Sequence, residues 1–351
     1  MPKIIIDPTS RILYASFYIE GLYQFFGKKN VSFSSSYFSN LKRDSEEFAF
    51  EHYFAFVLIN SDKKISKFVI DFCDPIDINP AAYAWCDYYA KINTDITLNE
   101  SNLPSKIISI PPGFGIKIWN KSETLYNCIL NLIKSKCSPI VSFKRFFKDY
   151  YEQYKRPKLE DYQNNESIIN SGTTIPYVFT IAKLWDDTDS MTRTNILRKK
   201  FIEICKSMNC NFEGGFFASS YNQHYEDFKS LLFYRLYSAN EYVTKTILSE
   251  IVFNTPSVHK CHGWKLGEFL AMGKPILSTP ISNKLPEDLV HGETLHIVSN
   301  DEELNIGINL LLTNSDYRFR LSQKAKDYYN KNVSPFSVIK NIVKSEYKNI
   351  S

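Results

Sequence analysis

The chain has 351 residues, enough for two domains at about 100–200 residues each. Its hydrophobic fraction of 44% and charged fraction of 23% are those of a globular protein. A formal net charge of +4 excludes a charge-driven nucleic-acid binder and suits a protein that holds anionic phosphates.

The first half of the chain alternates short apolar runs with amphipathic stretches. Strands are predicted at 4–6, 54–59, 68–72 and 106–110, and helices at 19–26, 81–90 and 123–133. Such alternation implies crossover connections and a parallel sheet covered on both faces. The chain begins without a signal-peptide pattern, and no run of about 18 apolar residues occurs. We therefore expect a soluble, cytoplasmic protein.

The polar stretch 155–176, with two prolines, predicts a linker, after which the alternation restarts. The later strands are predicted at 177–182, 251–254 and 275–278, with a strand end and a turn at 211–217. Helices are predicted at 194–207, 242–249, 265–272, 301–312 and 316–330. The sequence thus predicts an α/β fold of two Rossmann-like domains, at 1–165 and 172–333, whose parallel sheets face a central cleft. A C-terminal helix at 334–351 is expected to pack back on the first domain.

The clearest chemical pattern is FNTPSVHKCHGWKLGEFLAMGKPILSTPIS, residues 253–282. A strand ends in this stretch, a loop follows, and a helix starts at about Trp264. Open α/β sheets bind ligands at such loops, where the N–H groups and dipole of the helix N-terminus favour phosphate. Gly263 lets the backbone approach a ligand closely. Lys265 places a positive charge in the first helical turn, where it opposes the dipole unless an anion is bound.

This segment resembles the donor-binding motif of GT-B glycosyltransferases of the large family 4. The family has a Pro-Ser pair, a Gly-containing loop, and a Glu that opens a Glu-Ala-x-Ala-x-Gly-x-Pro run. The matching residues are Pro256, Ser257, Gly263, Glu268, Ala271, Gly273 and Pro275, with Phe269 in place of the first Ala. The resemblance implies that Glu268 binds the ribose of a nucleotide-sugar donor. We also assign Pro256, Ser257, Gly263, Trp264 and Lys265 to donor binding, although packing is the alternative for Trp264.

One position departs from the family motif. The first Glu of the family's pair would fall at Lys260, so the sugar and the stereochemical outcome stay open. We expect His262 to contact the transferred sugar instead and name it a catalytic candidate. A structural loop histidine is the alternative.

The resemblance extends upstream, to TIAKLWDD at 180–187 and FEGGF at 212–216. In the family a strand here ends in cations that hold the diphosphate and stabilise it as it leaves. Lys183 matches the first cation, and Arg193 is the candidate for the second. Gly214 and Gly215 resemble the turn that borders the base pocket. A solvated lysine and an ordinary turn are the alternatives.

In the first half the likeness is architectural only. Glu20, Gly21 and Gly113 are candidates for acceptor binding, and Asp74, after a strand that also carries Asp71, is the candidate base. Turns and caps are the alternatives for these residues. The basic and aromatic stretch 142–156 suits either an anionic membrane surface, at the inner face of the membrane, or packing between domains.

The seven cysteines show no metal-site spacing, and Asp186-Asp187 lies beside the proposed phosphate lysine, so no metal and no cofactor are expected. The expected function is metal-independent transfer of a sugar from a nucleotide-diphosphate sugar to a hydroxyl of a glycan or lipid-linked acceptor, in bacterial surface polysaccharide or glycoconjugate synthesis. One alternative is a catalytically inactive GT-B-like subunit that binds nucleotide sugars or glycans. A nicotinamide-dependent oxidoreductase is disfavoured, because no GxGxxG follows the first strand.

Overall fold

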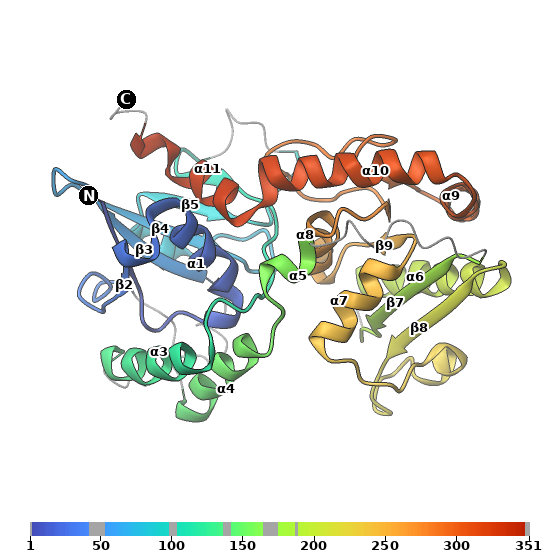
Figure 1. Cartoon of the computed structure of the whole chain (residues 1–351), viewed down its shortest axis with the longest axis horizontal. Coiled ribbons are helices and arrows are strands. Elements are labelled where there is room, and N and C mark those ends of the chain that lie inside the picture. Colours follow the sequence, from blue (N-terminus) through green and yellow to red (C-terminus); the bar gives the residue numbers. More distant parts are fainter. Residues whose placement is uncertain are drawn as a thin grey trace. The chain divides into compact units, whose positions relative to one another are not determined.

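The structure is a computed structural model that describes residues 2–41, 53–97, 104–135, 142–163, 175–186 and 189–347. Asp187 and residues 164–174 of the predicted linker lie outside these ranges. The chain forms two compact units, which Figure 1 draws in sequence colours. The N-terminal unit comprises 1–159, 283–286 and 331–351, and the C-terminal unit comprises 160–282 and 287–330.

The N-terminal unit is built on one six-stranded sheet of order β2-β1-β3-β4-β5-β6. Its strands are β1 (Lys3–Ile6), β2 (Val31–Phe33), β3 (Tyr53–Ile59), β4 (Ile65–Asp71), β5 (Tyr88–Lys91) and β6 (Ile107–Ser109). Its helices are α1 (Ile12–Phe26), α2 (Pro80–Trp85), α3 (Lys121–Lys134), α4 (Phe143–Tyr154) and α11 (Pro335–Tyr347). Strand β3 is buried over almost its whole length, as expected of a central strand covered on both faces.

The sheet of this unit is mixed, which the alternation pattern did not predict. Strand β3 runs antiparallel to β1 and β4, with Ile5 opposite Val57 and Val57 opposite Lys67, whereas the other strand pairs are parallel. Only five residues, 60–64, join β3 to β4, which is too short for a crossover and forces a hairpin. The carboxyl ends of β1, β4, β5 and β6 still share one edge of the sheet.

The predicted helix at 81–90 is wrong in its second half. Asn79 caps α2 by accepting a hydrogen bond from the Ala82 N–H, and Pro80 occupies the first turn, but the helix ends at Trp85. Residues 88–91 form β5 instead, paired in parallel with β4 and β6. Burial between two strands favours the extended form for these aromatic residues over the local helical period.

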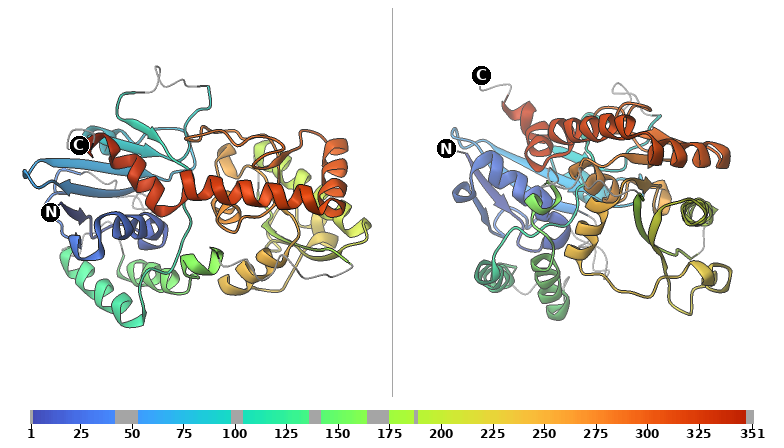
Figure 2. Two further views of the ribbon diagram at one scale, coloured as in Figure 1. Left: turned by 45° about the horizontal axis from the view of Figure 1, so that its top comes forward. Right: turned by 45° about the vertical axis from the view of Figure 1, so that its right-hand side comes forward.

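Helix α11 returns from the end of the chain and packs across α1, as the views in Figure 2 show. Gly21 lies at the crossing, where an added Cβ would come within 2.3 Å of the Pro335 carbonyl oxygen and 2.7 Å of the Ile339 side chain. The close approach of the two helices therefore depends on glycine.

The C-terminal unit contains parallel strands in two sheets, β7-β8 and β11-β10-β9. Its strands are β7 (Tyr177–Lys183), β8 (Asn211–Phe217), β9 (Val252–Asn254), β10 (Ile276–Ser278) and β11 (His296–Ile297). Its helices are α6 (Asp189–Ser207), α7 (Ala239–Leu248), α8 (Trp264–Ala271), α9 (Asp301–Thr313) and α10 (Ser315–Tyr328), and α5 (Leu159–Gln163) lies at the boundary of the units. The strand–helix alternation predicted for this half is confirmed.

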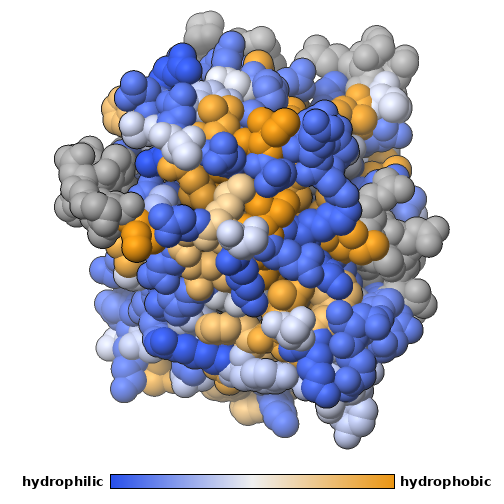
Figure 3. All heavy atoms as spheres, turned by 90° about the vertical axis from the view of Figure 1, so that its right-hand side faces the viewer, coloured by the Kyte–Doolittle hydropathy of each residue, from blue (hydrophilic) through white to orange (hydrophobic). Residues whose placement is uncertain are grey.

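The core of this unit joins both sheets to α6 and α9 through buried residues such as Phe201, Phe253 and Leu304. The rings of Phe201 and Phe253 stack with centroids 4.7 Å apart, which ties α6 to β9. Partly buried hydrophobic side chains pack around this core, and Figure 3 shows hydrophobic residues among hydrophilic ones on the face that it draws. Because α6 is held against β9 in this way, Asn195 and Arg198 of α6 reach the segments that follow β7 and β9.

Candidate functional site

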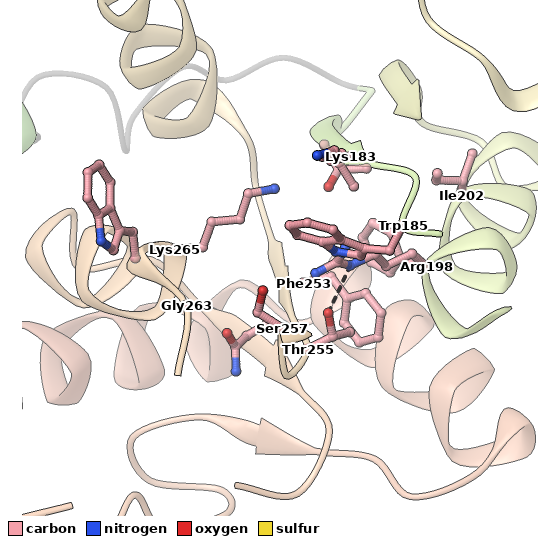
Figure 4. A pocket seen from close by; sticks show the side chains of 14 residues that line it. Lys183, Trp185, Arg198, Ile202, Phe253, Thr255, Ser257, Gly263 and Lys265 are labelled. Atoms are coloured by element: carbon pink, nitrogen blue, oxygen red, sulfur yellow. Dashed lines mark hydrogen bonds between the residues drawn. The ribbon is translucent and has the colours of Figure 1, made fainter. Parts of the chain in front are cut away.

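A pocket of about 220 Å³ opens at the carboxyl ends of β7 and β9, within the C-terminal unit. Figure 4 shows its lining, to which Lys183, Arg198 and Lys265 contribute three cationic side chains. Carboxyl ends of parallel strands are the usual ligand-binding edge of an α/β sheet. The position and the charge of this pocket therefore point to an anionic ligand.

One wall of the pocket is formed by the end of β7 and the residues after it. Lys183 ends the strand with an exposed side chain, and its Nζ lies 4.9 Å from the centre of the Trp185 ring. Asn195 of α6 holds the backbone of Trp185 by accepting from its N–H at 3.3 Å and donating to its carbonyl at 2.9 Å. Among the described residues the buried indole Nε1 of Trp185 has no hydrogen-bond partner. The loop after β7 thus supplies both a cation and an unused donor.

Arg198 comes from α6 and was missed by the sequence analysis. Its Nε donates to the Thr255 Oγ1 at 2.9 Å, which orients the guanidinium at the loop after β9. Burial lowers the pKa of Arg198 to about 10, so it is charged at neutral pH. A helical pattern places Arg198 one turn after Thr194 and Asn195, which are both buried, and this period was the available signal.

Arg193, the residue predicted for this role, lies five positions earlier in α6. The structure does not describe its side chain. Its predicted contact with the donor stays a prediction.

Lys265 stands in the first turn of α8, and its Nζ donates to the Ile181 carbonyl oxygen. Burial, followed by the charge of Arg198, lowers the pKa of Lys265 to about 7, although Glu268 acts in the opposite sense. The positive end of the helix dipole also disfavours a cation at this position. Burial, Arg198 and the helix dipole therefore all disfavour the charged form of this one amine, and the charge of a bound anion would offset them.

The loop before α8 has the form that the sequence predicted. Gly263 is the N-cap residue of α8 and supplies no side-chain cap, and a Cβ added there would meet only Ser257, at 3.7 Å. Ser257, Gly263 and Trp264 line the pocket together with the three cations. His262 and Pro256 are not among the pocket-lining residues. They line a smaller hollow that adjoins it, together with Gly263.

The predicted ribose ligand, Glu268, is buried in α8 and is not among the residues that line the pocket. Its Oε2 accepts a hydrogen bond from the Tyr242 hydroxyl at 3.2 Å. Burial, with the nearby Glu268 charge, raises the pKa of Tyr242 well above its usual value, so this hydroxyl remains a donor. A ribose would have to bind Glu268 beside the Tyr242 hydroxyl or displace that hydroxyl.

The turn predicted at Gly214 and Gly215 is wrong, because both residues lie within β8, where their φ angles are 126° and 150°. A Cβ would lie 1.8 Å from the Thr180 carbonyl oxygen at Gly214 and 2.3 Å from the Leu231 carbonyl oxygen at Gly215. These contacts account for both glycines through backbone packing. Thr180 also lines the pocket, so Gly214 helps to shape one wall.

In the N-terminal unit, two carboxylates lie at the carboxyl end of β4 or in the loop after it. Asp74 is exposed in the loop after β4, whereas Asp71 is buried and forms an ion pair with the buried Lys91 at 3.1 Å. The Tyr89 hydroxyl and the Cys73 N–H also donate to Asp71. Asp71 is thus committed to internal partners, and Asp74 is the more accessible carboxylate.

Glu20 and Gly21 lie on α1. Glu20 accepts a hydrogen bond from Gln24 at 3.0 Å, and Gly21 is covered by α11. Gly113 is buried, its N–H donates to the Tyr18 hydroxyl at 3.3 Å, and a Cβ there would lie 2.9 Å from the Phe17 ring. Packing accounts for both glycines, and acceptor binding by these three residues stays a prediction.

The N-terminus of α1 is filled by a side chain of the same unit. The Asp149 carboxylate accepts from the Ile12 N–H at 2.6 Å and the Leu13 N–H at 3.3 Å, and lies 3.4 Å from the Arg11 Nε. Burial raises the pKa of Asp149 to about 7, against the effect of Arg11. An internal carboxylate therefore occupies the helix terminus at which a phosphate would otherwise bind in this unit.

The described ranges of the chain lack two kinds of feature. No group of three or more His, Cys, Asp or Glu side chains gathers there in a way that would hold a metal ion. No helix within them is long and apolar enough to cross a membrane.

No protein-family model and no curated protein sequence matches the chain. Solved structures do match it. A glycosyltransferase from Rickettsia africae has 12% identity and a TM-score of 0.44 over 76% of this chain and 64% of its own. HepE from Anabaena, in complex with UDP, has 11% identity and a TM-score of 0.42 over 76% and 74%. A putative UDP-N-acetylglucosamine 2-epimerase from Listeria monocytogenes has 16% identity and a TM-score of 0.38 over 77% and 69%.

The chain spans less than two thirds of the Rickettsia structure. In fold it is an α/β protein with mainly parallel sheets, and its structural matches include GT-B glycosyltransferases at low sequence identity.

Proposed function

We propose that this protein is a glycosyltransferase that takes its sugar from a nucleotide-diphosphate donor bound at the pocket of the C-terminal unit. The observation that carries the proposal is the convergence of Lys183, Arg198 and Lys265 on the end of a parallel sheet, beside the N-terminus of α8. Such a site suits a diphosphate better than a neutral ligand. The motif at 253–282 adds the resemblance to a sugar donor site.

In this proposal the cations perform the electrostatic part of the reaction. The bond between the sugar C1 and the diphosphate oxygen breaks, and a new bond forms between C1 and an acceptor hydroxyl oxygen. Negative charge then develops on the departing diphosphate, where Lys183, Arg198 and Lys265 stabilise it without a metal. The proton of the acceptor hydroxyl passes to a base, for which Asp74 is our candidate.

His262 is our candidate for contact with the transferred sugar, and Glu268 for the ribose. The acceptor is a hydroxyl of a glycan or of a lipid-linked saccharide, as in bacterial surface polysaccharide or glycoconjugate synthesis. The loop that carries Lys260 is unusual, since both His259 and Lys260 have positive φ angles, of 54° and 57°. Because Lys260 replaces the first Glu of the family motif, a catalytically inactive subunit that binds nucleotide sugars or glycans is the second hypothesis.

The first test uses pyrophosphate and a panel of UDP, GDP, CMP and dTDP in calorimetry. Pyrophosphate carries no base, so it reports on the cations alone. Removal of one charged partner costs about 1.5–3 kcal/mol, so Arg198→Ala and Lys265→Ala should each weaken pyrophosphate binding about 10- to 150-fold. Lys206→Ala, which removes an exposed lysine at the end of α6, is the matched control and should bind like the unaltered protein.

Equal pyrophosphate affinity in all three variants would place the phosphate site elsewhere. Hydrolysis of the nucleotide sugar bound best, followed with and without EDTA, then separates the two hypotheses. Turnover that survives EDTA supports a metal-independent transferase. Tight binding with no turnover towards any acceptor supports the inactive subunit.

A further inference from the structure

The N-terminal unit exposes large hydrophobic side chains on two neighbouring helices, α3 and α4. On α3 the exposed residues are Leu125, Tyr126, Ile129 and Ile133, with exposed fractions from 47% to 66%. They follow a spacing of one and two turns and so share one face of the helix. The buried residues Thr124, Cys128 and Asn131 lie on the opposite face. Helix α3 is therefore apolar on its solvent side.

Helix α4 repeats this arrangement with aromatic residues. Phe143 and Tyr151 are exposed by 64% and 55%, and Phe147 lies between them on the same face, with its ring centroid 4.7 Å from that of Phe143. The exposed lysines Lys144, Lys148 and Lys155 border this aromatic face at helical spacing. The buried face of α4 carries Phe146, Asp149, Tyr150 and Gln153.

The charge of the chain is concentrated in this region. Residues 117–158 contain ten lysines and arginines and three acidic residues, a net charge of +7. The whole chain carries +4, so the remainder carries −3. The apolar faces of α3 and α4 therefore lie in the strongly basic part of an otherwise acidic chain.

We propose that α3 and α4 form a docking surface for an anionic lipid bilayer. Exposed aromatic and aliphatic side chains would enter the boundary between headgroups and acyl chains, while the bordering lysines contact lipid phosphates, as in helices that lie in the membrane interface. The helices pack against each other within the N-terminal unit, as Figure 1 shows, so one compact unit presents both. A second copy of the chain is disfavoured as the occupant, because two copies of this basic region repel each other.

The test is co-sedimentation of the full chain with vesicles of phosphatidylcholine, with and without phosphatidylglycerol. We expect binding to the anionic vesicles only, and its loss in high salt. The triple variant Lys144→Ala, Lys148→Ala, Lys155→Ala should lower the partition coefficient about 100-fold, at about fivefold per lysine. Ile129→Ser together with Phe143→Ser should lower it at least about tenfold, because both side chains are exposed and their loss leaves the core intact.

The matched controls lie in the C-terminal unit. They are Phe319→Ser, at a side chain 53% exposed on α10, and the triple variant of the exposed lysines Lys206, Lys229 and Lys324 to alanine. Both should bind vesicles like the unaltered chain, and circular dichroism verifies the folding of every variant. The proposal is overturned if the unaltered chain ignores anionic vesicles, or if the controls lose binding equally.

A dimer in light scattering that Ile129→Ser dissociates would overturn the proposal in favour of a second copy. A single-stranded oligonucleotide that displaces the protein from the vesicles would indicate nucleic acid instead. Pyrophosphate binding in the C-terminal unit is measured separately, so failure here leaves the proposed transferase function unaffected.

Discussion

At the scale of single residues, Glu268 and Lys265 have different environments and different proposed roles. Glu268 is a buried carboxylate with Tyr242 as a partner, while Lys265 is a cation beside a second cation, Arg198. A carboxylate of this kind is suited to accept ribose hydroxyls, and the lysine is suited to contact phosphate. Binding experiments can distinguish the two roles, because a nucleoside diphosphate has a ribose and pyrophosphate has none.

We expect Glu268→Gln to weaken binding of a nucleoside diphosphate about 10- to 150-fold and to change pyrophosphate affinity much less, because pyrophosphate has no ribose. The side chain keeps its size, so the buried site stays filled. Calorimetry with both ligands measures the difference. Tyr242→Phe is the control, since it removes the hydroxyl that now donates to Glu268 and should leave nucleotide affinity equal or higher. A Glu268→Gln variant that binds the nucleotide normally would exclude the ribose assignment.

The pH dependence of binding tests Lys265. Its pKa is lowered to about 7 in the free protein, and a bound anion raises it again. Binding therefore takes up a proton above pH 7, and affinity for UDP should fall between about pH 7.5 and 9.5, by at most about tenfold per pH unit. Lys265→Gln should bind more weakly and lose this slope. An equal slope in the variant would assign the pH dependence to another group.

At the scale of elements, the segments whose local pattern agrees with their burial were predictable. The strand, loop and helix at 251–272 correspond to β9 and α8, since the loop residues, the glycine and the apolar period all point to the same fold. Residues 88–91 were mispredicted because their pairing with β4 and β6 is a long-range property. Arg198 was not predicted as a site residue for the same reason, because its partner Thr255 is 57 positions away in the sequence.

The crossing of α1 and α11 provides a test at this scale. Gly21→Ala places a methyl group against the Pro335 carbonyl and should lower the free energy of unfolding by about 1–3 kcal/mol, as overpacking does. Gln24→Ala, an exposed position on the same helix, is the control and should be neutral or slightly stabilising. Chemical denaturation measures both. If the two variants are equally stable, α11 shifts enough to accommodate the added methyl group without loss of stability.

At the scale of the whole molecule, the two units differ in the functional features that they carry. The C-terminal unit carries the cationic pocket, and the N-terminal unit carries the basic helices α3 and α4. Each has its own sheet system and its own hydrophobic core. Two cores predict two cooperative unfolding transitions in place of one.

Scanning calorimetry of the Ile339→Asp variant tests whether the two units unfold independently. Ile339 is completely buried in α11 against α1, so a charge there should strongly destabilise the N-terminal unit. We expect one transition to move to lower temperature by many degrees while the other stays in place, with pyrophosphate still raising the second. A joint shift of both transitions would show that the units unfold together.

The return of α11 to α1 also has a consequence for biosynthesis. A ribosome makes the strands and helices of the N-terminal unit first, yet the helix that covers α1 is synthesised only after the whole C-terminal unit. Until then the apolar surface at the α1 crossing remains uncovered and available to chaperones. A chain that stops early, anywhere beyond the linker, keeps that surface open. The N-terminal unit can therefore complete its fold only after the C-terminal unit and α11 have been synthesised.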